Sequence, residues 1–200
     1  MLMNLIQIRQ LLLLPLFLSG MPLAADVVQS SNEETGLRKW QLLEGNLEVE
    51  LVQRLPDQTR GFFMARGFSA AIAEEIAVSC IFQTVIRNRG GPDAGGTIGI
   101  DLTQWRIHHA GGEQGVRLKE PWMASWSEGT VGEASRLAFQ WALFPTRQEF
   151  LADDYNWGMT AFGLPPGAVF DLDLAWQVNG KAHSARIAAI ECAPDVERLR

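Results

Sequence analysis

The most regular pattern of apolar and polar positions lies near the C-terminus. Residues 170–178 and 181–190 flank Asn179-Gly180, the kind of dipeptide that a two-residue type I′ turn favours. Counting outward from this turn pairs Asp173 with Arg186 across two antiparallel strands. This register places the alternating apolar side chains on one face and the ion pair on the other. The sequence therefore predicts a β-hairpin that packs its apolar face on the core.

Shorter alternations predict strands earlier in the chain. Leu47, Val49 and Leu51 alternate with two glutamates, and residues 81–87 form another apolar-rich run. Residues 137–143 also alternate, with Phe and Trp among the apolar positions. Their neighbours over 133–138 would suit a helix taken alone, but the sustained alternation and the aromatic residues favour a strand.

One strand is predicted to be irregular. Ile98, Ile100 and Leu102 alternate, and the apolar phase then shifts to Trp105 and Ile107. Because an extra residue in one strand produces such a shift, we expect a β-bulge near Thr103.

Two short helices are predicted between these strands. The first covers residues 57–66, and the second begins at Ser69, a residue type that caps helix N-termini well. The apolar stripe of the second helix has a helical spacing and comprises Ile72, Ile76 and Cys80.

These elements together predict a mainly β protein. Seven or eight short strands, separated by Gly, Pro and Asn turns, indicate an antiparallel β-sandwich or a partly open barrel, with a short two-helix insertion near residues 57–79. Residues 26–36 are polar and aperiodic, and we expect them to be a flexible leader. A single globular β-rich domain is then expected over residues 37–200.

The N-terminus has the features of a secretory signal peptide. Arg9 makes the first segment basic, Leu11 to Leu18 form an apolar core, and small residues precede Asp26. The apolar core is about 8 to 10 residues long, too short for a membrane-spanning helix of about 20. We expect residues 1–25 to be removed, which leaves a periplasmic or secreted protein without a stable membrane anchor.

Charge and cysteine content refine this expectation. Residues 1–25 contain one basic and no acidic residue, so their removal changes the net charge from −6 to −7. An acidic surface repels phosphate, and we expect no nucleic-acid partner. Because an exported protein meets an oxidising environment, Cys80 and Cys192 are expected to form a structural disulfide. Free thiols or metal ligands are the alternatives.

The aromatic composition points to a recognition surface. The chain has seven tryptophans and one tyrosine. Trp141 and Trp176 lie on faces that the strand pattern would bury. We expect Trp122, Trp126 and Trp157 to form an exposed binding surface, because the indole combines a large apolar area with one hydrogen-bond donor.

A soft-metal site is a sharper hypothesis within the same class. His108 and His109 supply imidazoles, while Met123 and Met159 supply thioethers next to tryptophans. Thioether and imidazole ligands together suit Cu(I). The four residues could converge only through the fold, and core packing is the ordinary role of methionine.

The sequence contains no recognisable catalytic motif of a hydrolase. We therefore expect an exported, non-catalytic binding or accessory protein, whose ligand is an unknown protein, a glycan or a metal such as copper. The alternative is a hydrolase-type enzyme with a site assembled from Asp101, His108 and His109, which would have to converge in one cleft.

Overall fold

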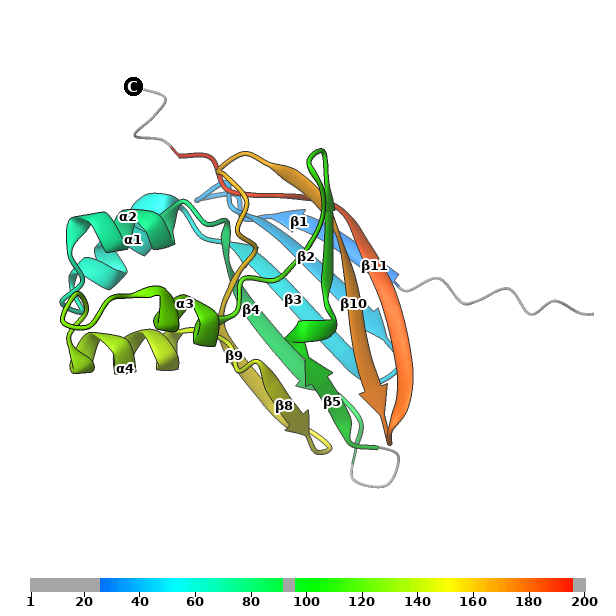
Figure 1. Cartoon of the computed structure of the whole chain (residues 1–200). Helices are drawn as coiled ribbons and strands as arrows, with labels where there is room; N and C mark the ends of the chain where they lie inside the picture. Colours follow the sequence, from blue (N-terminus) through cyan, green and yellow to red (C-terminus); the bar gives the residue numbers. More distant parts are fainter. Residues whose placement is uncertain (1–25, 92–95, 196–200) are drawn as a thin grey trace, which may run out of the picture.

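The computed structural model of the chain describes residues 26–91 and 96–195. The predicted signal peptide lies outside these residues. Two mainly antiparallel sheets pack face to face, and four helices lie together at one end of the sandwich (Figure 1). The predicted β-sandwich with a helical insertion is therefore confirmed.

The first sheet, sheet A, has five strands with antiparallel neighbours. Their order across the sheet is β1 (Asp26–Ser31), β2 (Arg38–Glu44), β3 (Leu47–Gln53), β4 (Ile81–Asn88) and β9 (Tyr155–Ala161).

The second sheet, sheet B, has six strands and is built around the long strand β10. The order is β7 (Gly112–Gly115), β6 (Arg106–His109), β10 (Val169–Val178), β5 (Ile98–Asp101) and β8 (Arg147–Phe150), and β11 (Lys181–Glu191) also pairs with β10.

The C-terminal hairpin has the predicted register. Asp173 lies opposite Arg186 and Trp176 lies opposite His183. Asn179 and Gly180 have positive φ angles of 51° and 77°, as a type I′ turn requires. The turn sequence and the Asp173–Arg186 pair thus fix the register together.

Three predictions of local structure are wrong. Residues 26–31 form the edge strand β1 and not a flexible leader, because backbone pairing with β2 stabilises a segment whose side chains are mostly exposed. A 3₁₀ helix, η1 (Leu102–Gln104), replaces the predicted bulge and reorients the chain between β5 and β6. The predicted strand over 137–143 is largely helical.

The helices form two pairs inserted between strands. The first pair, α1 (Pro56–Met64) and α2 (Ala70–Ala77), is the predicted insertion, and Ser69 caps α2 by accepting a hydrogen bond from the Ile72 N–H. The second pair, α3 (Lys119–Ser125) and α4 (Glu133–Ala142), was not predicted.

Two apolar clusters stabilise the fold. One lies between the sheets and includes Trp40, Phe82, Ile107 and Trp176. The other packs the helices against the adjoining ends of β4 and β9, around Phe139. Each cluster buries aromatic side chains, which contribute the largest apolar areas.

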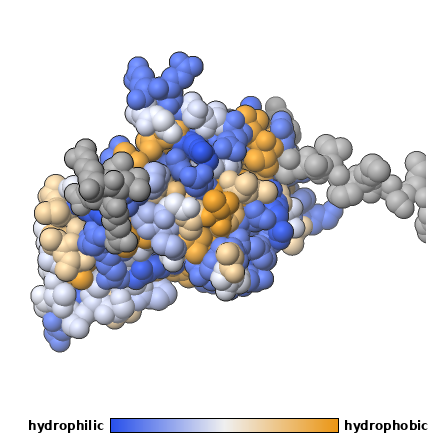
Figure 2. All heavy atoms as spheres, turned by 90° about the horizontal axis from the view of Figure 1, so that it is seen from above, coloured by the Kyte–Doolittle hydropathy of each residue, from blue (hydrophilic) through white to orange (hydrophobic). Residues whose placement is uncertain are grey.

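Cys80 and Cys192 form the expected disulfide, and both are buried. None of the helices within residues 26–91 and 96–195 combines the length and the apolar character needed to cross a bilayer. On the face shown in Figure 2, apolar residues form separate patches in a largely hydrophilic surface. Such patches are the places to look for a recognition site.

Candidate functional site

The predicted surface of three tryptophans is not formed. Trp122 and Trp126 are buried, at 2% and 7% exposure, and their rings pack against Phe139 at centroid distances of 5.3 and 4.9 Å. The Trp122 Nε1–H donates to the Glu75 Oε1 at 2.9 Å, so its polar group is satisfied inside the protein. Of the three residues, only Trp157 is exposed, at 63%.

Helix α4 exposes a different tryptophan. Because the helix has 3.6 residues per turn, Phe139 faces the core while Leu137 and Trp141 face solvent. Trp141 is 79% exposed, and the expectation that it would be buried is wrong. The alternating apolar residues over 137–143 are therefore partly buried and partly exposed.

Trp141 and Trp157 line the same small cleft. Its volume is about 240 Å³, and its walls come from the start of α3, from α4 and the segment after it, and from β9. We call it the tryptophan cleft, lined by Lys119, Gln140, Trp141, Leu143, Pro145, Asn156 and Trp157.

A close backbone approach holds the two indoles at this cleft. The Phe144 N–H donates to the Met159 carbonyl at 2.8 Å, and Leu143 forms a parallel bridge with Met159. Gly158 precedes Met159 on β9, and a Cβ added at Gly158 would lie 2.7 Å from the Phe144 nitrogen. Glycine at this position thus allows the end of α4 to dock on β9.

Two polar side chains of the cleft, Lys119 and Asn156, are engaged in holding its shape. Lys119 Nζ donates to the Gln140 carbonyl at 3.2 Å, and burial lowers the pKa of this ammonium group, while Glu120 opposes that shift. Asn156 Nδ2 donates to the Gln148 Oε1 at 2.6 Å, and Asn156 Oδ1 accepts from the Trp157 N–H. The cleft therefore offers a ligand indole, leucine and proline surface beside the exposed Gln140 side chain.

The residues proposed for a soft metal do not form one site. Met123 and Met159 pack in the helical cluster, on the side of sheet A, whereas His108 and His109 lie on β6 of sheet B. Both imidazoles have other partners, since His108 Nε2 lies 2.7 Å from Asp173 Oδ2 and His109 Nδ1 accepts from the Gly111 N–H. Within the described ranges there is no group of three or more His, Cys, Asp or Glu that could hold a metal ion.

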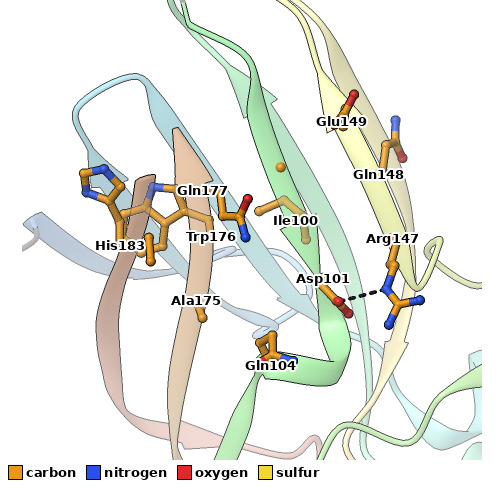
Figure 3. Close-up of a pocket in the computed structure, with 12 residues that line it drawn as sticks. Ile100, Asp101, Gln104, Arg147, Gln148, Glu149, Ala175, Trp176, Gln177 and His183 are labelled. Atoms are coloured by element: carbon orange, nitrogen blue, oxygen red, sulfur yellow. Dashed lines mark hydrogen bonds and ion pairs between the residues drawn. The ribbon is translucent and has the colours of Figure 1, made fainter. Parts of the chain in front are cut away.

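The residues proposed for a hydrolase site also have separate partners. Asp101, on β5, lines a hollow that neither His108 nor His109 lines, and its Oδ2 accepts from the Arg147 Nε at 2.8 Å (Figure 3). Partial burial alone would raise the pKa of Asp101, but hydrogen bonds from Thr103 and Arg147 outweigh that effect and lower it. His108 is paired with Asp173, and its Nδ1 lies 3.7 Å from Glu113. These groups do not make a common catalytic constellation.

The sequence did hold a signal for helix α4, which contributes to the cleft. Ser135 and Phe139 are buried four residues apart, and Leu137 and Trp141 are exposed four residues apart, which is helical spacing. No signal in the sequence indicates that Trp141 and Trp157 would line one cleft, because the close approach of Phe144 to Gly158 depends on the fold. No protein-family model matches the chain, and neither a curated protein nor a solved structure is detectably similar to it.

Proposed function

We propose that this chain is an exported, non-catalytic binding or accessory protein that recognises a partner protein at the tryptophan cleft. The observation that carries the proposal is the exposure of two indoles, at 79% and 63%, on the walls of one cleft. Exposed tryptophans at a concave site are the residues that most often dominate the affinity of protein interfaces. A solvent-facing position would otherwise favour polar side chains.

The size of the cleft supports a side chain as its occupant. Pockets that hold a complete small molecule measure about 300–1,000 Å³. The tryptophan cleft, at about 240 Å³, is smaller and suits one large apolar side chain of a partner. We therefore propose an extended peptide segment with a single aromatic or aliphatic anchor.

The hydrogen bonding of the cleft favours a peptide over a glycan. A sugar carries many hydroxyl groups, and each one that is desolvated needs a donor or an acceptor. Asn156 and Lys119 already use polar atoms to hold the cleft itself. An apolar anchor needs no such partners, and its burial gains about 25 cal/mol per Å² of apolar surface.

Copper is not part of the proposal, because both methionines lie in the helical cluster.

Export is the second part of the proposal. The signal-like residues 1–25 and a disulfide that suits an oxidising compartment support it. We expect the protein recovered from the periplasm to begin at or near Asp26, with both sulfurs oxidised. Intact-mass measurement tests both points, and a full-length cytosolic chain with free thiols would contradict this part.

The binding part is tested by selection from a displayed library of random peptides against the purified chain. We expect the selected peptides to share one aromatic or large aliphatic residue and to change the fluorescence of the exposed tryptophans. Trp157→Ala and Trp141→Ala should each weaken binding about tenfold or more, the loss typical of an interface hot spot. Isothermal titration with one selected peptide gives the dissociation constants.

Leu151→Ala is the matched control, because Leu151 is 64% exposed and does not line the cleft. Its affinity for the peptide should equal that of the unsubstituted chain. Peptides that bind all three variants equally would overturn the proposed site. If an oligosaccharide array gives the only ligands that depend on Trp141 and Trp157, the proposed class of partner is wrong.

A further inference from the structure

A second hollow lies on the outer face of sheet B, and the strand register explains it. Gly99 of β5 is the cross-strand partner of both Glu149 and Gln177, and Gln177 is in turn opposite Ala182. Cross-strand partners point to the same face of a sheet. Glu149 and Gln177 are therefore two strand spacings apart, about 10 Å, with no side chain between them.

The neighbouring residues complete this hollow, whose volume is about 640 Å³ (Figure 3). Small residues, Gly99, Ala175 and Ala182, contribute to its floor, and longer polar side chains line it. Its volume lies within the range of about 300–1,000 Å³ that small-molecule sites occupy. The tryptophan cleft does not share any lining residue with it.

Several polar side chains of the hollow have donors or acceptors that a ligand could use. Asp101 is fixed by Thr103 and by the Nε of Arg147. In the part of the chain that the structure describes, the two terminal guanidinium nitrogens of Arg147 have no hydrogen-bond partner, and neither do the Glu149 and Gln177 side chains. Asp101 thus orients the guanidinium and leaves its outer edge available.

Charge and spacing define the ligand. Arg147 pairs with Asp101 and is also close enough to the Glu120 carboxylate to feel its charge, so negative charge is in excess around the hollow. Glu149, which lines the hollow, therefore favours a cation. The free edge of Arg147 favours a carboxylate, which a guanidinium binds in bidentate fashion. Arg147 and Glu149 are two residues apart on one strand, about 6.6 Å. The ends of an extended dipeptide are separated by up to about 7 Å.

We propose that this hollow binds a small zwitterion in the size range of an amino acid or dipeptide, with its ammonium group at Glu149 and its carboxylate at Arg147. Gln104 and Gln177 also line the hollow, and the Gln177 amide has a donor and an acceptor for the backbone of such a ligand. This site is independent of the partner-protein site, and either can fail without the other.

The test is a nuclear magnetic resonance titration of the ¹⁵N-labelled protein with L-alanyl-L-alanine to about 20 mM. Because partly exposed ion pairs are weak, we expect saturable shifts of the Gly99, Glu149 and Gln177 amides with a dissociation constant on the order of 1 mM. N-acetyl-alanyl-alanine and alanyl-alanine amide should each bind about fivefold more weakly or worse, since each lacks one charge.

Gly99→Val is the decisive variant. An added Cβ at Gly99 has its nearest neighbour at 3.8 Å, so valine fits the strand and fills the floor of the hollow. It should abolish the titration, whereas Gly115→Val, in β7 where the added Cβ has no neighbour within 4 Å, should not. Glu149→Gln should remove the preference for the free amino end over the acetylated one.

Four results would overturn this assignment. The first is the absence of saturable shifts for the unsubstituted chain. The second is equal binding of the free and both blocked dipeptides. The third is binding that survives Gly99→Val in a folded variant, as judged by its amide spectrum. Stronger binding of glucose than of the dipeptide at the same amides would show that the ligand class is wrong.

Discussion

Single residues decide how α4 docks on β9 and so how Trp141 and Trp157 come to line one cleft, and Gly158 is the clearest case. An added Cβ there would contact the backbone of Phe144 at 2.7 and 2.8 Å, which only a shift of α4 or β9 could relieve. We expect Gly158→Ala to destabilise the fold by about 2 kcal/mol, as overpacking commonly does. Gly115→Ala, with open space around the added Cβ, should stay within about 1 kcal/mol. Urea unfolding of both variants checks this, and equal losses would show that the approach at Gly158 is not constrained.

Asp173 gives the molecule a specific dependence on pH. Hydrogen bonds from Arg186, and further from His108, lower its pKa in the folded protein, and partial burial opposes them only in part. A carboxyl group with a lowered folded pKa stabilises the fold above its unfolded pKa, about 3.9, and loses that effect as the pH falls through the folded value. We expect Asp173→Asn to reduce the free energy of unfolding at pH 7. The difference from the unsubstituted chain should shrink steadily below pH 4. A difference that is constant from pH 7 to pH 2.5 would contradict this account.

At the scale of elements, α4 separates what alternation can and cannot predict. Leu137, Phe139 and Trp141 alternate as a strand would, yet only Phe139 is buried. We expect Phe139→Ala to cost about 3–5 kcal/mol, because it removes the centre of the helical cluster. Trp141→Ala should cost no more than about 0.5 kcal/mol, as is usual for an exposed position. Chemical denaturation distinguishes the helix from a strand, in which both residues would face the core and both substitutions would be costly.

The elements that sequence analysis predicted correctly are those with a local cause. Asn179-Gly180 specifies its turn, and Ser69 caps its helix through its own side chain. Strand β1 has no such cause, since only pairing with β2 makes a polar segment extended. The candidate site was predicted in part: Trp157 is exposed as expected, while Trp122 and Trp126 are buried by a helix pair whose packing depends on distant residues.

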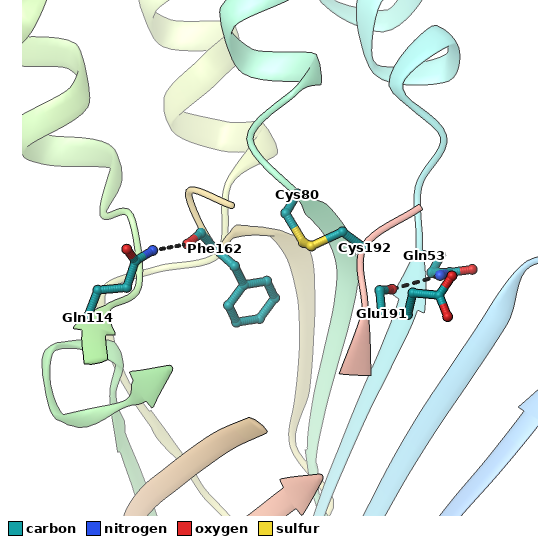
Figure 4. The surroundings of a disulfide bond; sticks show 6 residues. All are labelled: Gln53, Cys80, Gln114, Phe162, Glu191 and Cys192. Atoms are coloured by element: carbon teal, nitrogen blue, oxygen red, sulfur yellow. Dashed lines mark hydrogen bonds between the residues drawn. A yellow bond between two sulfur atoms is a disulfide. The ribbon is translucent and has the colours of Figure 1, made fainter. Parts of the chain in front are cut away.

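At the scale of the whole molecule, one covalent bond joins parts that are distant in sequence. Cys80 lies between α2 and β4, and Cys192 directly follows β11, 112 residues later. The Gln53 side chain donates to the Glu191 carbonyl at 2.7 Å beside it, and Phe162 lies on the other side (Figure 4). The bond therefore ties both sheets and the first helix pair at one point.

The disulfide should set how much stability the protein keeps in a reducing environment. In the chain-entropy treatment, closing a loop of about 110 residues lowers the entropy of the unfolded chain and so raises its free energy by about 4–5 kcal/mol. We expect the reduced protein and the Cys80→Ala/Cys192→Ala variant to unfold at clearly lower urea concentrations than the oxidised protein. The reduced protein keeps both sulfur atoms in the core, so the difference between it and the double variant isolates the packing of the sulfurs from the constraint on the chain. If oxidised and reduced forms unfold at the same midpoint, the bond does not stabilise the sandwich, and the main structural argument for an oxidising compartment fails with it.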